Sequence, residues 1–311
     1  STTYLCVVTN SYGTDTSAAA LLTVYGILYV KENAADGGDG SSWSSAFGGL
    51  QEALGAAGGG MQIWVSRGTY YPGDTVGGST ARHAAFTLKN RVAVYGGFAG
   101  NETKLSSRKP RSNATILSGD IGVTGDKADN AYHVFNNAGR GLDASAVIDG
   151  FIIELGNADG AGNDGRGAAM LNDGSDPTVA GCTLRKNSAV TGGAVSGINT
   201  NSVMSGCTFS DNAATYGGGV HARASNLSLY DCTFYFNSSD SLGGALYVDS
   251  AATITADSCT FRNDSARDGG AVYCIYNGAT AAVFTNCTLD SNEAVRGGAV
   301  SISGGRCQLT S

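Results

Sequence analysis

Apolar and polar residues alternate along five copies of one unit between residues 182 and 300. Each copy opens with Cys-Thr-Phe or Cys-Thr-Leu, reaches an Asn or Asp five residues after the Cys, and continues to a Gly pair followed by Ala or Gly and then Val or Leu. The alternation has a period of two, which is the spacing of a β-strand. The copies begin at Cys182, Cys207, Cys232, Cys259 and Cys287, with steps of 25, 25, 27 and 28 residues.

A repeat of this length is typical of a solenoid. The units are too short and too rich in Gly, Asn, Asp and Ser turns to hold a helix between their strands. The pattern therefore predicts an all-β fold in which short parallel strands stack rung on rung, a parallel β-helix. Each rung would serve as the template for the next one.

Equivalent positions of the repeat should form columns along the coil. We expect the five Cys residues to stack inside as small apolar side chains, with a Phe or Leu column beside them. The Asn column, which Asp264 interrupts, should lie at a corner and satisfy turn groups. The Gly pairs should allow a tight bend where a Cβ atom would clash. The Phe and Leu column comprises Leu184, Phe209, Phe234, Phe261 and Leu289, and the Asn column comprises Asn187, Asn212, Asn237, Asp264 and Asn292.

These motifs resemble the repeats of chlamydial-type polymorphic outer-membrane proteins and, more broadly, bacterial right-handed β-helix surface proteins with a pectin-lyase-like fold. The clear motifs cover residues 182–304, and a weaker resemblance covers residues 28–150. The resemblance implies a right-handed solenoid and a location at the cell surface. It implies little about activity, because the same coil carries adhesins, lyases and hydrolases.

The chain divides into three predicted parts. Residues 1–25 resemble the last hairpin of an immunoglobulin-like domain, because Tyr4 stands two residues before Cys6 in an alternating strand. Residues 26–60 should form an amino-terminal cap, with a helix that Ser44 or Ser45 caps and Trp43 as a plug. Residues 61–311 should form the coil, which ends in the middle of a rung, so we expect the chain to be a piece of a longer protein. The apolar positions of the cap helix are Ala46, Phe47, Leu50, Ala53, Leu54 and Ala57.

Composition narrows the possible functions. The 311 residues include 47 glycines, carry 14% charged residues and have a net charge of −7. The short basic run Arg108–Arg111 is the main positive cluster, so we expect no nucleic-acid partner. No run of 18 apolar residues is present, so we expect no transmembrane segment in this chain. The eight Cys residues follow the coil repeat, which favours free buried thiols over disulfides.

No familiar catalytic signature is present in the sequence, and the three His residues stand apart in the chain. The densest acidic segment holds Asp120, Asp126 and Asp129 near basic residues 108–111. A polysaccharide lyase or glycoside hydrolase would need such carboxylates, the lyase together with a cation or Ca²⁺. Calcium at this site or beside Asp36 and Asp39 is an open alternative, but we predict no cofactor and no metal. The alternative role of these acids is to form turns in a solvated loop.

A column that follows the Gly pairs offers a second candidate site. His221, Tyr247 and Tyr273 occupy one register, together with Ser196 and Ser301. By alternation these residues should face solvent, where the aromatic rings can stack against a glycan or a partner protein. The alternative is that Tyr simply suits strands and cross-rung stacking.

The sequence thus predicts a secreted or cell-surface β-helix protein, associated with a bacterial outer membrane, that acts as a rigid display scaffold for adhesion. Its partners would be a glycan or a surface protein of a host or neighbouring cell. A secreted polysaccharide lyase or glycoside hydrolase of pectin-lyase-like fold is the main alternative, and a purely structural spacer is another. Whether the chain is an enzyme is left open, with a non-enzymatic role favoured.

Overall fold

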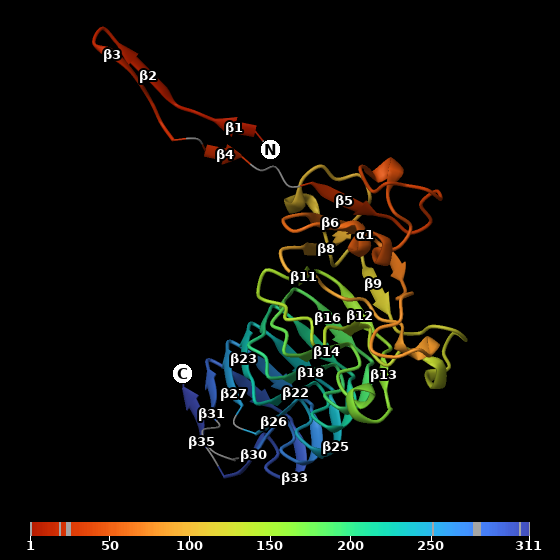
Figure 1. The fold of residues 1–311 in the computed structure, drawn as a ribbon. Coiled ribbons are helices and arrows are strands. Elements are labelled where there is room, and N and C mark those ends of the chain that lie inside the picture. Colours follow the sequence, from red (N-terminus) through yellow and green to blue (C-terminus); the bar gives the residue numbers. More distant parts are fainter. Residues whose placement is uncertain are drawn as a thin grey trace.

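A computed structural model describes residues 2–18, 20–22, 26–250, 252–275, 281–304 and 306–310. Near the amino end, β1 (Thr2–Tyr4) pairs antiparallel with β4 (Ala20–Leu22), and β2 (Val7–Asn10) pairs antiparallel with β3 (Gly13–Thr16). Figure 1 shows these strands apart from the coil. The predicted hairpin is therefore present, and its assignment to an immunoglobulin-like domain stays a prediction.

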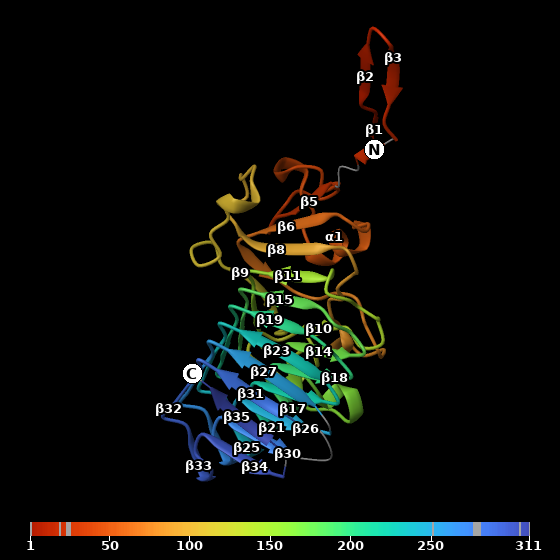
Figure 2. The same ribbon diagram turned by 90° about the vertical axis from the view of Figure 1, so that its left-hand side faces the viewer.

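The rest of the chain is the predicted parallel β-helix, with four parallel sheets as its walls (Figures 1 and 2). The ten-stranded sheet contains β5 (Ile27–Val30), β6 (Gln62–Ser66), β8 (Ala93–Phe98), β11 (Val147–Asp149), β15 (Thr178–Ala180), β19 (Val203–Ser205), β23 (Asn226–Tyr230), β27 (Thr253–Asp257), β31 (Ala281–Thr285) and β35 (Arg306–Thr310). The eight-stranded sheet contains β7 (Gly68–Tyr70), β9 (Thr115–Ser118), β12 (Ile152–Glu154), β16 (Thr183–Arg185), β20 (Thr208–Ser210), β24 (Thr233–Tyr235), β28 (Thr260–Arg262) and β32 (Thr288–Asp290).

Two further sheets close the later rungs. The six-stranded sheet contains β13 (Asn157–Ala158), β17 (Ser188–Thr191), β21 (Ala213–Tyr216), β25 (Ser238–Leu242), β29 (Ser265–Asp268) and β33 (Glu293–Arg296). The seven-stranded sheet contains β10 (Phe135–Asn136), β14 (Met170–Asp173), β18 (Val195–Ile198), β22 (Val220–Arg223), β26 (Leu246–Asp249), β30 (Val272–Ile275) and β34 (Val300–Ser303). Short 3-10 helices lie at Trp43–Ser45, Ala81–His83, Leu105–Ser107, Lys127–Asp129 and Gly162–Gly165. Within the described ranges, no helix has the length and apolarity needed to cross a membrane.

The core follows the predicted columns. Phe209, Phe234 and Phe261 are fully buried and stack face to face, with ring centroids 4.4 and 4.8 Å apart. Adjacent rungs pair in register, Phe209 with Phe234 and Phe234 with Phe261, so each ring lies directly on the next. The column loosens towards the carboxyl end, where Leu289 is only half-buried.

The Gly pairs make the predicted bend. Gly192 adopts a φ of +67°, and a Cβ atom there would lie 2.3 Å from the carbonyl oxygen of Val195. The second glycine, Gly193, has no positive φ, but its Cβ would lie 2.2 Å from the Gly218 oxygen in the next rung. The first Gly is thus required by its backbone conformation and the second by the close approach of a neighbouring rung.

The Asn column lies at the corner between the eight-stranded and six-stranded sheets. The amide nitrogen of Asn212 donates to the side-chain oxygen of Asn237 at 3.0 Å and to the backbone oxygen of Leu184 at 2.9 Å. The left-handed residue at this corner is not the Asn itself but the residue before it, such as Asp211 with a φ of +55°. Each Asn therefore stays in ordinary backbone geometry and satisfies the turn through its side chain.

The cap differs from the prediction in its details. Helix α1 spans Leu50–Ala56 and covers the open core with Leu50, Ala53 and Leu54, as expected. It starts after Gly49, so Ser44 and Ser45 do not cap it, and Phe47 instead bridges to Val30. Trp43 is not a plug, because its half-buried ring packs against Tyr29 and Phe98 and its indole nitrogen donates to the backbone oxygen of Glu102 at 2.9 Å. Sequence periodicity included Ala46 and Phe47 because it cannot distinguish an extended approach from the first helical turn.

All eight thiols are free, and five of them are buried: Cys182, Cys207, Cys232, Cys259 and Cys274. Burial raises the pKa of the Cys182 and Cys274 thiols to about 12, so these thiols stay protonated and unreactive in the folded state.

Thiol titration tests this arrangement. We expect Cys6, the exposed thiol, to react first in the native protein, and all eight thiols to react in denaturant. A Cys6→Ser variant should lose the fast phase and keep the rest. Fewer than about six reactive thiols in denaturant would contradict a ladder of free cysteines.

Candidate functional site

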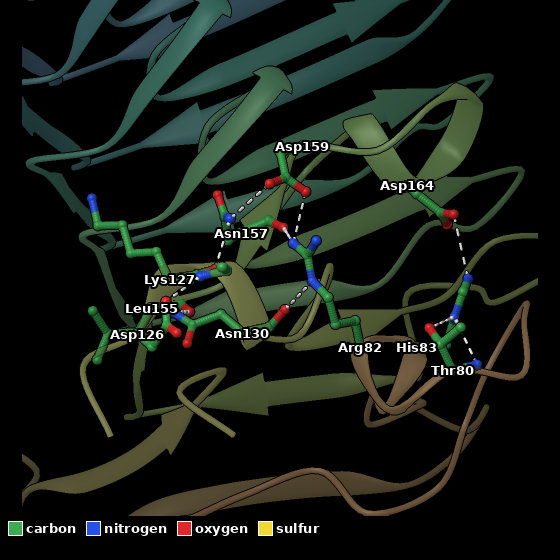
Figure 3. Close-up of polar contacts among 11 residues, drawn as sticks. Thr80, Arg82, His83, Asp126, Lys127, Asn130, Leu155, Asn157, Asp159 and Asp164 are labelled. Atoms are coloured by element: carbon green, nitrogen blue, oxygen red, sulfur yellow. Dashed lines mark hydrogen bonds and ion pairs between the residues drawn. The ribbon is translucent and has the colours of Figure 1, made fainter. Parts of the chain in front are cut away.

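Loops from the first rungs meet at a corner that Arg82 holds together (Figure 3). The Arg82 guanidinium donates to the backbone oxygen of Asn130 at 2.8 Å and to that of Asn157 at 2.7 Å. It also pairs with the Asp159 carboxylate at 2.7 Å and lies 4.0 Å above the ring of Tyr132. One side chain thus fixes three segments that are up to 77 residues apart in the sequence.

The same corner contains an imidazole between a hydroxyl and a carboxylate. His83 Nδ1 lies 2.6 Å from Thr80 Oγ1, and His83 Nε2 lies 3.3 Å from Asp164 Oδ2 (Figure 3). Thr80 and His83 also form a reciprocal capping box around the short helix Ala81–His83. This capping role accounts for the hydroxyl–imidazole contact, so the arrangement braces the loop against Asp164.

A second imidazole, His133, is buried beside this corner. Burial lowers the pKa of His133 to about 4, so the ring is neutral at physiological pH. Its Nδ1–H donates to the Gly167 oxygen at 3.1 Å, and its Nε2 has no partner within the described residues. The ring is therefore part of the wall and is closed to solvent.

A surface groove lies along these loops, and we call it the loop groove. Its first part, about 470 Å³, separates α1 from the excursion that contains Asp74, and its second part, about 410 Å³, reaches Asp164. Val76 and Arg140 line both parts. The floor is apolar, with Leu54, Leu88 and Leu142 buried beneath it. The polar lining residues are Gln51, Asp74, Thr75, Thr87, Lys89, Asn90, Asn136, Arg140, Asn163 and Asp164.

The structure does not bring the three predicted acids together as a reactive set. Asp120 accepts from the Gly125 amide at 3.0 Å, Asp126 from the Ala128 amide at 2.9 Å, and Asp129 from the Val123 amide at 2.7 Å. All these bonds stay within one loop, which fits the role of turn formers. Over the described ranges, no group of three or more His, Cys, Asp and Glu side chains has an arrangement that would hold a metal ion.

The expectation that the column after the Gly pairs faces solvent is wrong for most of its members. Ser196, His221 and Tyr247 are buried, with exposed fractions of 0%, 4% and 9%, and Tyr273 is half-buried. They do point out of the core, but the Gly bend folds the six-stranded sheet against them, and the Tyr216 ring lies 5.7 Å from that of Tyr247. Alternation gives the direction of a side chain and not what covers it.

Contacts within this column explain its residues without a ligand. The His221 ring stacks on Tyr247 at 5.1 Å, and the Tyr247 ring is 6.2 Å from that of Tyr273. His221 Nε2 also lies 3.5 Å from the Asp249 carboxylate. Burial, with the Asp249 charge second, raises the pKa of Tyr247 to about 12. Cross-rung stacking, the alternative drawn from the sequence, describes this column.

Sequence reasoning missed the residues that build the loop corner. Arg82 and His83 lie in one irregular excursion, Asn130 in a second, and Asp159 and Asp164 in a third, and the three share no motif. Only the fold shows that these excursions belong to successive rungs and therefore meet. The available signal was that the excursions interrupt consecutive early rungs.

A match to a family model identifies the family of this chain. A family model described as a right-handed β-helix region matches residues 133–311. Among solved structures, the crystal structure of pectate lyase Pel9A is similar, with 13% identity and a TM-score of 0.45 over 91% of this chain and 79% of that one. No curated protein matches the sequence.

Proposed function

Since the chain belongs to the right-handed β-helix family, we propose that it is an extracellular or cell-surface protein whose coil is a rigid scaffold that displays loops for recognition of a glycan or a partner protein. The observation that carries this proposal is the fixation of the first-rung loops around the loop groove. Arg82 joins three excursions, and the pair His83–Asp164 adds a further link. Loops held in this way lose little conformational freedom on binding, which favours affinity.

The regular rungs suit the supporting role. Their inward side chains form the stacked core, and their corner side chains form the hydrogen bonds of the Asn column. The loop groove, by contrast, combines an apolar floor with a polar rim, which is the usual composition of a binding site. Asp74 and Arg140 are both exposed on that rim, and neither side chain forms a hydrogen bond or ion pair with another described residue.

We expect the double variant Asp74→Ala/Arg140→Ala to bind its glycan or protein target at least about tenfold more weakly, because both side chains line the groove. Binding would be measured on a panel of immobilised glycans and on cell surfaces. Because neither residue braces the fold, thermal unfolding should be unchanged. The matched control is Asp240→Ala/Arg223→Ala, which removes the same charges from exposed positions on the regular rungs.

The same panel separates the alternatives. A polysaccharide lyase would generate unsaturated uronides that absorb in the ultraviolet, and a glycoside hydrolase would release reducing ends. Either signal, if lost in Asp120→Ala, would support an enzyme over a scaffold. Binding that the control pair reduces as much as the groove pair would argue against the loop groove, and no binding on any surface would favour a spacer.

A further inference from the structure

A second groove, of about 570 Å³, lies where β5, β6 and β8 end, and we call it the basic groove. The carboxyl ends of parallel strands meet at one edge of a sheet, so residues that follow these strands come together there. Lys31 follows β5, and Arg67 separates β6 from β7. Figure 2 shows the excursion that follows β8 projecting beside this edge. The groove is lined by Lys31, Glu32, Ser66, Arg67, Gly68, Ala99, Ser112 and Ala114.

The two cationic side chains that line this groove are exposed and available to bind a ligand. Lys31 and Arg67 make no side-chain hydrogen bond or ion pair with any residue that the structure describes. The turn that supplies Ser112 also carries Lys109 and Arg111, and the Ser112 amide donates to the Lys109 oxygen at 2.9 Å. Several other arginines of the chain pair with carboxylates, among them Arg82, Arg108, Arg185 and Arg296.

The nearby acids are already engaged. Glu32 Oε1 accepts from the Thr69 amide at 3.0 Å, which holds this carboxylate at one edge of the groove. Glu102 accepts from the amides of Ala99, Gly100 and Asn101 at 2.7, 3.0 and 3.1 Å. Neither carboxylate forms an ion pair with Lys31 or Arg67, so the positive charge of the groove is left for a ligand.

The distribution of charge along the chain also favours anion binding near the amino end of the coil. Residues 26–118 carry nine Lys and Arg against six Asp and Glu, whereas residues 119–311 carry ten against nineteen. A polyanion is therefore attracted to residues 26–118 and repelled by residues 119–311. This asymmetry would direct an anionic polymer to the basic groove.

We propose that the basic groove binds sulfate or phosphate ester groups carried by a polysaccharide, a ligand class that rests on the proposed recognition function. An Arg fork, a Lys ammonium and a Ser hydroxyl together match the oxygens of a tetrahedral anion. None of the lining side chains is aromatic, so the groove lacks the stacking surface that retains single-stranded nucleic acid.

The test compares dextran sulfate with dextran of the same length, by calorimetry on the intact chain at low salt. Dextran sulfate should bind and dextran should not. The Lys31→Gln/Arg67→Gln pair should weaken binding by about tenfold or more, because two charge-assisted contacts are lost. Glu32→Gln keeps an acceptor for Thr69 and should strengthen binding by about two- to threefold, since it removes a repelling charge.

The control pair Arg223→Gln/Arg262→Gln removes two exposed cations from the regular rungs and should change affinity less than about twofold. Equal losses in the two pairs would overturn the site, because binding would then follow bulk charge. Equal binding of dextran would overturn the anionic ligand, and equal or tighter binding of a single-stranded oligonucleotide would overturn the polysaccharide. Competition by inorganic sulfate against phosphate distinguishes the two esters. If dextran sulfate does not bind at the basic groove while the glycan or protein target still binds at the loop groove, this inference alone is refuted and the scaffold function stands.

Discussion

The free energy of unfolding of an Asp264→Asn variant should exceed that of the unmodified chain by on the order of 3 kcal/mol at pH 8. At pH 4 the two values should differ little. Asp264 occupies the Asn column and is completely buried. Its Oδ1 accepts from the backbone and side-chain nitrogens of Asn237 at 2.8 and 2.9 Å, as an Asn oxygen would. Its Oδ2 stands where the other members have an amide nitrogen, and it has no hydrogen-bond partner among the residues that the structure describes.

The other members show what this second atom must do. The amide nitrogens of Asn237 and Asn292 donate to the backbone oxygens of Phe209 and Phe261, at 3.0 Å each. The repeat places the oxygen of Phe234 in the same position for Asp264. Two oxygens facing each other repel unless one carries a proton, so the native state favours the neutral carboxylic acid. Burial raises the pKa of Asp264 to about 7, in agreement with this geometry.

The direction of the pH effect follows from proton linkage. Between its unfolded pKa near 3.8 and its folded pKa near 7, the native state binds a proton that the unfolded chain has released. The stability that Asp264 contributes is therefore complete below about pH 4 and is lost as the pH rises through 7. His133 works in the opposite sense, because its lowered folded pKa costs stability as the pH falls from 6.5 towards 4.

The measurement is therefore the difference between Asp264→Asn and the unmodified chain in urea unfolding from pH 4 to 8, in which the His133 contribution cancels. Asn237→Asp is the reverse control, since it places a second acid in the column and should destabilise the coil most at high pH. A difference that stays flat across this range would mean that Asp264 ionises as an ordinary surface carboxylate does.

The repeat predicted the coil because each of its residues has the same surroundings in every rung. Phe234 between two rings and Cys232 in the wall are dictated by their neighbours one period away, so sequence spacing carries the packing. The Asn column was predicted for the same reason, although the left-handed conformation belongs to residues such as Phe236 that share no chemistry.

The candidate site could not be predicted in this way. The loop corner depends on contacts such as Arg82 to Asn157, 75 residues apart, between excursions of different length and composition. The predicted solvent exposure of the column at Tyr247 was wrong for a related reason. The direction of these side chains follows from local alternation, but the six-stranded sheet, which carries Tyr216, covers them. Periodic features are local in the sequence, whereas binding surfaces here arise where the period is broken.

Gly244→Ala should have one of the large effects among single methyl groups added to the coil, with a loss of about 3 kcal/mol or more in unfolding free energy, or failure to fold. Gly244 is the second glycine of its pair and has no positive φ, so its backbone tolerates any residue. Its Cβ, however, would lie 2.2 Å from the oxygen of Gly270 and 2.6 Å from the nitrogen of Ser265. Both atoms belong to the next rung, where the Ser265 amide donates to Asn237 and the Gly270 amide donates to Gly297, so cross-rung hydrogen bonds fix the backbone around them.

The chain supplies a matched control one rung away. Gly219 occupies the position where the other rungs carry Ala194, Ala245, Ala271 and Ala299. A Cβ at Gly219 would lie 2.8 Å from the backbone oxygen of Ala245, a less severe approach than at Gly244, and the other rungs accommodate Ala there. Gly219→Ala should therefore cost on the order of 1 kcal/mol, well below Gly244→Ala, although it adds the same methyl group in the same bend. Urea unfolding of both variants decides the matter. If Gly244→Ala were tolerated as well as Gly219→Ala, the rungs could separate at the bend, and the tight approach of neighbouring backbones would not be what selects the second glycine. If only Gly244→Ala destabilises the coil, the close spacing of neighbouring rungs is the reason that each repeat of this chain has a glycine at this position.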